Sequence, residues 1–576
     1  MVFFMGHSAG LPVKSWQAPF GRQHHVANRV AVNRNCADQF LAPHASHRVK
    51  FGSPVAMSEA SVKTRLAAVK AQVQEIEDIG SAMAQASWTE QTAPIGEAAA
   101  IPLQEMNATF TKLRHGKLTD PTFVAALREL SKPAAMATLT IGEQALVRVV
   151  SEDVDKALKL PAEFVGRQAD VAKVGFSTWE KAKKANSFAD FAPVLTQLVD
   201  LAREKAGYLG YDKTKGSPYD ALMNEYEPGL SVRQMDQVFE PLKRELPILV
   251  KAIQKAQASQ SPGDLALRQA IIGKQGVLSK RMKLSQWVLG KMGFDFQRGI
   301  LGASPHPFTT SFGSPNLVPL TIGRNEGIIS SVLSGMHEGG HGNYAQGAPG
   351  WMLRTSLAGS PSLGMDESQS RLWENVMGRS REVWTTLLPQ LKREFPKQFG
   401  EVTLDSLLKA VNTVEPGVVR LLADEVTYNL HILVRYEIER DLIEGKLEVA
   451  DVPKAWSGKI KSYLGQEPKG DADGALQDVH WSDGSFGYFP TYTLGNLASV
   501  QFFNQMKREI PGVSGKIQRG QWSVVNDWMR EKIYSVGRIE KPDQILRRVT
   551  GESLNPKYFI DYLWDKYIDL YGITRP

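Results

Sequence analysis

Residues 336–341 constrain this chain more than any other stretch, because they place two histidines four positions apart around an acid. On a helix, side chains at that spacing share one face, with Cβ atoms about 5–6 Å apart. His337 and His341 can therefore bind one divalent ion, and Glu338 is placed to reach a water beside it. The alternative is a surface helix that carries two solvated histidines.

The flanks of this stretch favour the metal site. Positions 328, 329, 332, 333 and 336 are apolar and recur with a helical period, which predicts a buried helix. Gly339, Gly340 and Gly342 follow, and each costs about 1 kcal/mol of helix stability relative to Ala. Three of them together indicate that another backbone or a substrate approaches closely. The pattern His-Glu-x-x-His on such a helix is typical of zinc-dependent peptide hydrolases.

Composition limits the kinds of site available. The only cysteine among 576 residues is Cys36, so neither an intrachain disulfide nor a cysteine-based metal site is possible. No apolar run reaches the 18 or so residues expected of a membrane-spanning helix. The net charge of +7 is uneven, since residues 1–57 contribute +5 and the remainder only +2. We therefore expect neither nucleic acid nor a membrane as partner.

Residues 1–57 resemble an organelle transit peptide, because they contain arginines and small residues but only one acid. This interpretation predicts a plastid or mitochondrial location. If the segment is not a transit peptide, a cytoplasmic location is expected. The alternative is that translation starts at Met57. In either case the segment is excluded from the fold.

From Ser58 onward the sequence is helical in pattern, and one all-α domain over residues 58–576 with a few short strands is expected. An apolar stripe from Val62 to Ile76 predicts the first helix, followed by a break at residues 87–100. Further helices are predicted at 103–113, at 121–130, in three pieces within 140–205 (broken at 160–161 and 192–193), at 231–257 and within 262–289. The segments 307–323 and 481–490 are the best candidates for extended structure.

A third metal ligand is predicted at Glu367, which opens a helix 26 residues after His341. Its alternative role is that of an acid favoured at a helix N-terminus. Asp366 is expected either to cap that helix or to orient a ligand histidine.

A second helix, expected over residues 418–444, is apolar around most of its circumference and is therefore buried. Arg420, Asp424, Tyr428, His431 and Arg435 form a polar stripe along it. Such a stripe is typical of a substrate groove, in which an arginine can hold a carboxylate. The alternative is a structural ion pair between Arg420 and Asp424.

The segment 474–492 is rich in glycine and aromatic residues. His480, Tyr488 and Tyr492 within it are candidates to stabilise an oxyanion. Ordinary aromatic packing is the alternative for each tyrosine.

Together these motifs resemble the carboxypeptidase Taq family of metallocarboxypeptidases. The resemblance rests on His306-Pro307-Phe308, on the 337–341 motif, on Glu367-Ser368-Gln369, on Arg420 to Glu425 and on Gly474 to Trp481. It implies a saddle-like helical fold with a deep groove, akin to neurolysin and angiotensin-converting enzyme, and a homodimer.

The resemblance also implies the ligands and the roles of the site residues. It implies one Zn²⁺, or Co²⁺, per subunit on His337, His341 and Glu367, with Glu338 as base. Arg420 would anchor the terminal carboxylate of the peptide, and His306 would also bind substrate. Asp366 and Asp424 are expected to support the metal ligands.

Two positions depart from the family pattern. The usual Asp-x-Arg-x-Thr is replaced by residues 316–320, which read Asn-Leu-Val-Pro-Leu and lack the arginine. The histidine usual before Glu367 is Asp366, an acid that can still support the metal site.

The sequence thus predicts a metallocarboxypeptidase that removes single C-terminal residues from peptides with broad specificity. An oligopeptidase of the same metal class, cleaving internally, is the first alternative because of the missing arginine. A non-catalytic peptide-binding protein on a decayed enzyme scaffold is the second.

Overall fold

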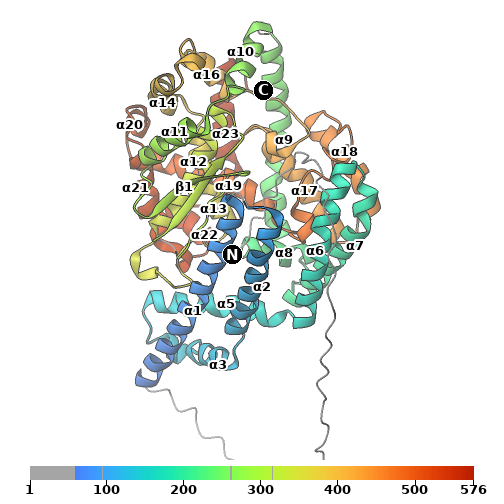
Figure 1. The fold of residues 1–576 in the computed structure, drawn as a ribbon, viewed down its shortest axis with the longest axis vertical. Helices are drawn as coiled ribbons and strands as arrows, with labels where there is room; N and C mark the ends of the chain where they lie inside the picture. Colours follow the sequence, from blue (N-terminus) through green and yellow to red (C-terminus); the bar gives the residue numbers. More distant parts are fainter. Residues whose placement is uncertain (1–58, 94, 260–261, 314–315) are drawn as a thin grey trace, which may run out of the picture.

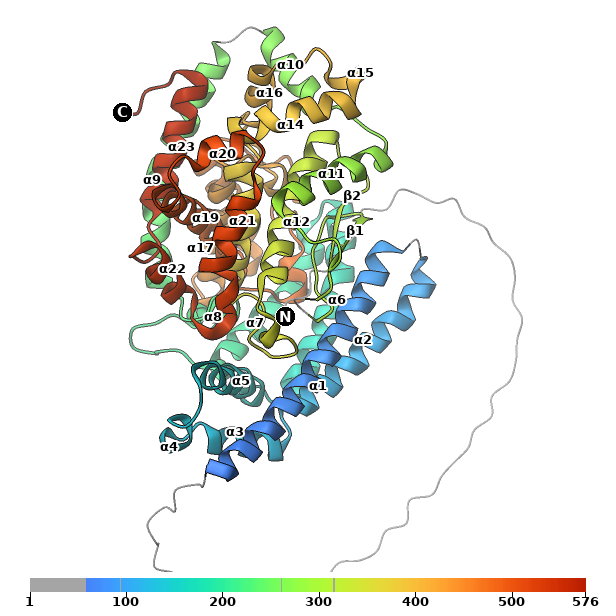
Figure 2. The same ribbon diagram turned by 90° about the vertical axis from the view of Figure 1, so that its left-hand side faces the viewer.

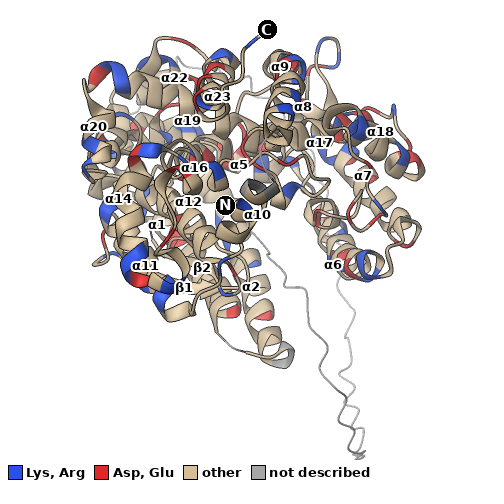
Figure 3. Ribbon diagram, turned by 90° about the horizontal axis from the view of Figure 1, so that it is seen from above, with Lys and Arg blue, Asp and Glu red and all other residues tan. Residues whose placement is uncertain are grey.

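The computed structural model describes residues 59–576 except 94, 260–261 and 314–315. The expected transit peptide, residues 1–57, lies outside the described residues. Helices dominate the described part of the chain, as predicted (Figures 1 and 2). Basic and acidic residues are interspersed along them (Figure 3). Among the helices described, none has an apolar stretch long enough to span a membrane.

The N-terminal helices form a long hairpin, at the lower right in Figure 2, and a small cluster beside its lower end, at the lower left. They are α1 (Glu59–Thr92), α2 (Glu97–Leu118), α3 (Pro121–Leu130), α4 (Pro133–Met136) and α5 (Ile141–Lys159). The predicted stripe from Val62 to Ile76 is buried, and it packs against apolar residues of α3 and α5. The break predicted at 87–100 is wrong in extent, because α1 continues to Thr92 and α2 already begins at Glu97.

A second group of helices surrounds the first large core. It contains α6 (Ala162–Ala185), α7 (Phe188–Leu209), α8 (Pro218–Tyr226), α9 (Val232–Ala258), α17 (Tyr428–Ile443), α18 (Val452–Leu464) and the C-terminal helix α23 (Pro556–Tyr571). Ser231 caps α9 as predicted, in a capping box with Gln234. The break predicted at 192–193 is wrong: Pro193 lies within α7, and the chain turns instead at Asn186, which has a φ of 54°.

The remaining elements surround the second large core. They are α10 (Pro262–Ile272), α11 (Leu278–Met292), α12 (Ile328–Gly347), α13 (Leu363–Arg371), a π-helical segment η2 (Leu372–Met377), α14 (Arg381–Glu394), α15 (Pro396–Phe399), α16 (Leu404–Val411), α19 (Pro490–Glu509), α20 (Val513–Gln518), α21 (Ser523–Lys532) and α22 (Pro542–Thr550). Helix α19 contributes to both cores, with Leu497 in the first and Phe502 in the second. It therefore joins the two groups of helices, as does η2, with Val376 in the first core and Trp373 in the second.

Two short strands form a parallel pair, β1 (Gly299–Ser304) and β2 (Val318–Gly323). Strand β2 is buried along its whole length and packs on α12. It lies inside the extended segment predicted at 307–323, whereas β1 was not predicted. The extended segment predicted at 481–490 is wrong, because it forms a 3₁₀ turn (His480–Asp483) and the start of α19.

Close helix packing explains the glycines of the metal motif. A Cβ added to Gly340 would lie 2.6 Å from the carbonyl oxygen of Gln369 on α13. On the other side of α13, a Cβ added to Gly495 of α19 would lie 2.5 Å from Cβ of Glu367. The predicted approach of another backbone is confirmed at Gly340. Gly339 instead faces side chains of α11, and Gly342 faces the side chains of Phe294 and Leu320.

Candidate metal centre

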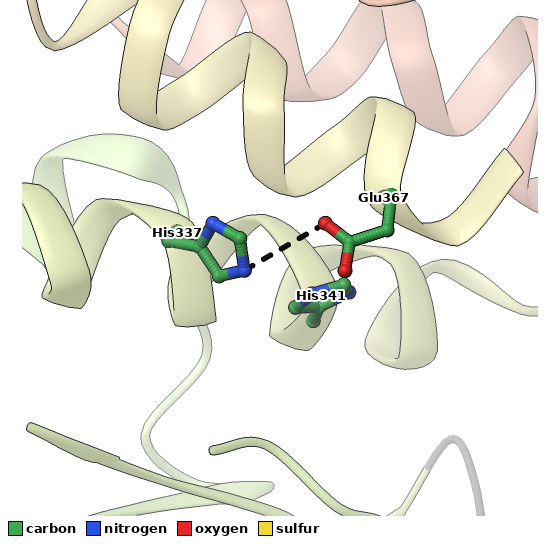
Figure 4. Close-up of side chains that lie close together, drawn as sticks. All are labelled: His337, His341 and Glu367. Atoms are coloured by element: carbon green, nitrogen blue, oxygen red, sulfur yellow. Dashed lines mark ion pairs between the residues drawn. The ribbon is translucent and has the colours of Figure 1, made fainter. Parts of the chain in front are cut away.

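The three predicted ligands converge from two neighbouring helices. Helix α12 carries His337 and His341, and α13 carries Glu367 across from them (Figure 4). Each residue offers one ligand atom, and these atoms lie within 4.8 Å of one another. Nε2 of His337 lies 3.8 Å from Oε2 of Glu367. Two imidazoles and one carboxylate at this separation fit a zinc site that keeps a position for water.

Carboxylates orient both imidazole rings from the side away from Glu367. Nδ1 of His337 donates a hydrogen bond of 2.8 Å to Oε2 of Glu374, and Oδ2 of Asp366 lies 3.0 Å from Nδ1 of His341. Because each Nδ1 faces a carboxylate, each ring keeps Nε2 for a metal ion. Ser362, and not Asp366, caps α13.

Glu374 was not predicted from the sequence. A signal was available, because Glu374 follows Glu367 by seven residues, or about two helical turns, and so returns to the same helix face. Arg371, between them, lies 3.6 Å from Glu367 and donates to Glu374 at 2.9 Å. Burial acts to raise the pKa of Glu374, but the charges of Arg371 and His337 outweigh it and hold that pKa below its usual value.

Glu338 is buried beside the ligand histidines. Burial raises its pKa above the usual value, although His337, His341 and a hydrogen bond from Thr309 favour the charged form. For Glu367 the balance is reversed: burial acts to raise its pKa, but His337 and Arg371 lower it overall. The two carboxylates therefore differ in basicity, as expected if one accepts protons and the other binds a cation.

A second polar cluster is built around Asp478. Its Oδ1 accepts from Nε and Nη2 of Arg420 at 3.0 and 2.8 Å, and its Oδ2 accepts from Nε of Arg435 at 2.6 Å. Tyr428 accepts a further hydrogen bond from Nη1 of Arg420 at 2.9 Å. Two buried arginines on one carboxylate leave a net positive charge, which can attract an anion. Asp478 was missed as a partner, although it stands inside the 474–481 motif.

The helix predicted at 418–444 is corrected by the structure. It begins only at Tyr428, and Arg420 lies in a separate 3₁₀ turn in which Leu421 and Leu422 are 67% and 84% exposed. Asp424 accepts hydrogen bonds from the backbone of Val426 and Thr427, so its side chain replaces a helical turn at this point. Both predicted roles of Asp424 are therefore wrong: it does not pair with Arg420, and it does not support the metal ligands.

The three predicted oxyanion residues lie together. Nε2 of His480 lies 3.4 Å from the Tyr492 hydroxyl, and its ring centroid lies 5.2 Å from that of Tyr488. Burial lowers the pKa of His480 to about 3, so the ring is neutral at physiological pH. Arg420 stands over the Tyr492 ring at 5.3 Å, which joins this group to the Asp478 cluster. His306, in contrast, is exposed, and its carbonyl accepts a hydrogen bond from Ser304.

An all-α fold in which His-Glu-x-x-His on one helix meets a glutamate from the next defines a metallopeptidase. Residues 68–567 match the family described as carboxypeptidase Taq (M32) metallopeptidase. The chain therefore belongs to this family of metallocarboxypeptidases, which are peptide hydrolases.

Relatives and solved structures agree with the assignment. The chain is 34% identical over 458 residues to "Thermostable carboxypeptidase 1" of Pyrococcus furiosus, which covers 79% of this chain and 89% of that protein. It is 35% identical over 425 residues to "Carboxypeptidase 1" of Bacillus subtilis, covering 74% and 83%. The crystal structure of the M32 carboxypeptidase from Deinococcus radiodurans superposes with a TM-score of 0.83 at 34% identity, covering 88% of this chain and 100% of that one. The predicted carboxypeptidase function is thereby supported over both alternatives.

Proposed function

We propose that this carboxypeptidase binds one Zn²⁺, or Co²⁺ in its place, through His337, His341 and Glu367. The convergence of these three side chains is the observation that carries the proposal. The donor set suits zinc, which takes imidazole nitrogen and carboxylate oxygen. When bound, such an ion polarises the scissile carbonyl and makes water more acidic.

Glu338 acts as the general base in this proposal. Its carboxylate accepts a proton from the attacking water and later passes that proton to the leaving amine. Burial raises the pKa of Glu338, so the carboxylate is a stronger base than a solvated glutamate.

Arg420 selects the free C-terminus of the peptide. Its Nε and one N–H of each Nη are used by Asp478 and Tyr428, which hold the guanidinium plane in place. One N–H of each Nη remains, and together these can bind a carboxylate in bidentate fashion. Val318 stands at the position of the family's second arginine and is fully buried, so it cannot bind the peptide terminus. Arg420 therefore carries the exopeptidase selectivity.

Neutral His480, with Tyr488 and Tyr492, supports the developing oxyanion by donating hydrogen bonds. Asp366 holds the His341 ring. His306 is proposed to contact substrate, which its exposure allows.

The proposal extends to assembly and location. The enzyme forms a homodimer, and it resides in a plastid or mitochondrion if residues 1–57 act as a transit peptide, or otherwise in the cytoplasm. Imaging of the chain with and without residues 1–57, each fused to a fluorescent protein, tests the location. Light scattering tests the dimer.

The catalytic proposal is tested with an unblocked peptide, its C-terminally amidated twin, and the Glu338→Gln variant. We expect the parent enzyme to shorten the free peptide one residue at a time and to spare the amide, as read by mass spectrometry. Glu338→Gln should retain bound metal, measured by elemental analysis, but lose hydrolysis. Internal fragments, or hydrolysis by Glu338→Gln at the parent rate, would overturn the proposal.

A further inference from the structure

The segment that follows His306 pairs with β2 and forms an edge beside the metal helix. The backbone of Thr310 donates to the Pro319 carbonyl at 3.0 Å, and that of Thr321 donates to the Phe308 carbonyl at 2.9 Å. Thr309 makes an antiparallel bridge with Leu320. Alternate side chains of an extended segment point to opposite sides, so Thr309 and Thr310 face different surroundings.

Thr309 reaches the carboxylate of Glu338. Its Oγ1 lies 2.7 Å from Oε2 of Glu338 and 3.0 Å from the carbonyl oxygen of the same residue. A carboxylate can only accept hydrogen bonds, so the threonine hydroxyl is the donor. This contact ties one carboxylate oxygen of Glu338 to the sheet edge, and the other oxygen remains for a water.

Two buried hydroxyls fix the backbone from which Thr309 projects. Oγ1 of Thr321 accepts from the backbone N–H of Phe308 at 3.0 Å and lies 2.6 Å from Oγ of Ser304. The Ser304 hydroxyl also donates to the His306 carbonyl. Ser304 and Thr321 are both fully buried, so water does not compete for these contacts.

We propose that Thr309 is a positioning residue of the peptidase, whose hydroxyl holds the Glu338 carboxylate in the orientation that accepts a proton from water. The inference rests on the proposed role of Glu338 as base. It assigns a purpose to the His306-Pro307-Phe308 motif, which sets the register of the segment and so places the threonine that follows.

Three variants test the assignment. Thr309→Val keeps the side-chain shape but removes the donor, and we expect kcat to fall about tenfold or more, as for loss of a hydrogen bond to a charged group. Thr309→Ser keeps the hydroxyl and should recover most of the rate. Thr310→Val is the matched control on the same segment, because it keeps the backbone hydrogen bond to Pro319, and it should behave as the parent.

Bound metal and KM should stay at parent values in all three variants. A fall in kcat alone then distinguishes a positioning role from loss of the site. If Thr309→Val does not fold, Thr309→Ala removes the hydroxyl without a β-branched side chain. A kcat of the hydroxyl-free variant within about twofold of the parent overturns the inference, as does failure of Thr309→Ser to recover the rate.

Glu338→Gln, measured in parallel, separates the two proposals. Hydrolysis by Glu338→Gln refutes the proposed role of Glu338 as general base. An inactive Glu338→Gln beside a fully active Thr309→Val refutes only the role of Thr309.

Discussion

Oε2 of Glu374 lies 2.8 Å from Nδ1 of His337, on the side of the ring away from Glu367. The contact makes the far nitrogen of the imidazole more basic and fixes its direction. It also ties α12 to the π-helical segment that follows α13, since Glu374 belongs to that segment. A ligand on one helix is thus oriented by an acid on the next.

Replacing Glu374 should weaken metal binding rather than remove the ligands. Glu374→Gln retains the size of the side chain but loses its charge, and we expect metal affinity to fall about 10- to 100-fold. Competition with a chromogenic chelator measures this affinity. Glu401→Gln, at an exposed site, is the control and should bind metal as the parent does. Equal affinities of the two variants would contradict the role of Glu374.

Arg420 should determine recognition of the peptide terminus. Arg420→Lys keeps a positive charge but cannot hold Asp478 and a carboxylate at the same time, so KM for an unblocked peptide should rise about tenfold or more. The preference for that peptide over its amidated twin, measured as the ratio of their kcat/KM values, should become smaller. Steady-state kinetics on the pair measure both effects, and an unchanged preference would show that another group reads the terminus.

Packing between α13 and α19 should control the geometry of the metal centre. Gly495→Ala places a methyl group 2.5 Å from Cβ of Glu367 and 2.9 Å from its carbonyl carbon, which is backbone and cannot rotate away. We expect a loss of about 1–3 kcal/mol of unfolding free energy together with weaker metal binding.

Denaturant unfolding and chelator competition measure these two effects of Gly495→Ala. Gly458→Ala is the control, because nothing lies within 4 Å of the added methyl and alanine favours a helix. Unimpaired metal binding by Gly495→Ala would show that α13 has room to move.

Glu227 should make stability depend on pH. Burial raises its pKa from 4.5 to about 7, against hydrogen bonds from Ser362 and the backbone of Gly364. Between these two values the folded state keeps a proton that the unfolded state releases, so stability falls as pH rises. This contribution is complete below pH 4.5 and is lost as pH passes 7.

The Glu227→Gln variant isolates this contribution. The unfolding free energy of the parent minus that of the variant should fall by on the order of 3 kcal/mol between pH 4.5 and 8. Denaturant titrations at several pH values measure it. A difference that stays constant with pH would show that Glu227 titrates normally.

The sequence predicted those features that depend on local spacing. The helix with His337 and His341 and the Ser231 cap of α9 follow from periodicity and capping, which are local properties. Glu367 was predicted from the usual completion of such a metal site by a carboxylate on a following helix. The partner of Arg420 did not follow, because Asp478 is brought to it by tertiary packing across 58 positions. The start of α17 was misplaced because an aspartate side chain replaced backbone hydrogen bonds that an apolar pattern does not reveal.

Helix α19 belongs to both hydrophobic cores, and its Gly495 touches the residue that offers the third ligand. The two halves of the enzyme consequently share this helix as one rigid partition, and it packs against Glu367 without free space at the point where a cation would bind. A hinge along that partition would pull Glu367 out of line with the imidazoles. Motions that admit or release peptide are therefore expected in segments remote from this partition, with the reactive centre staying still.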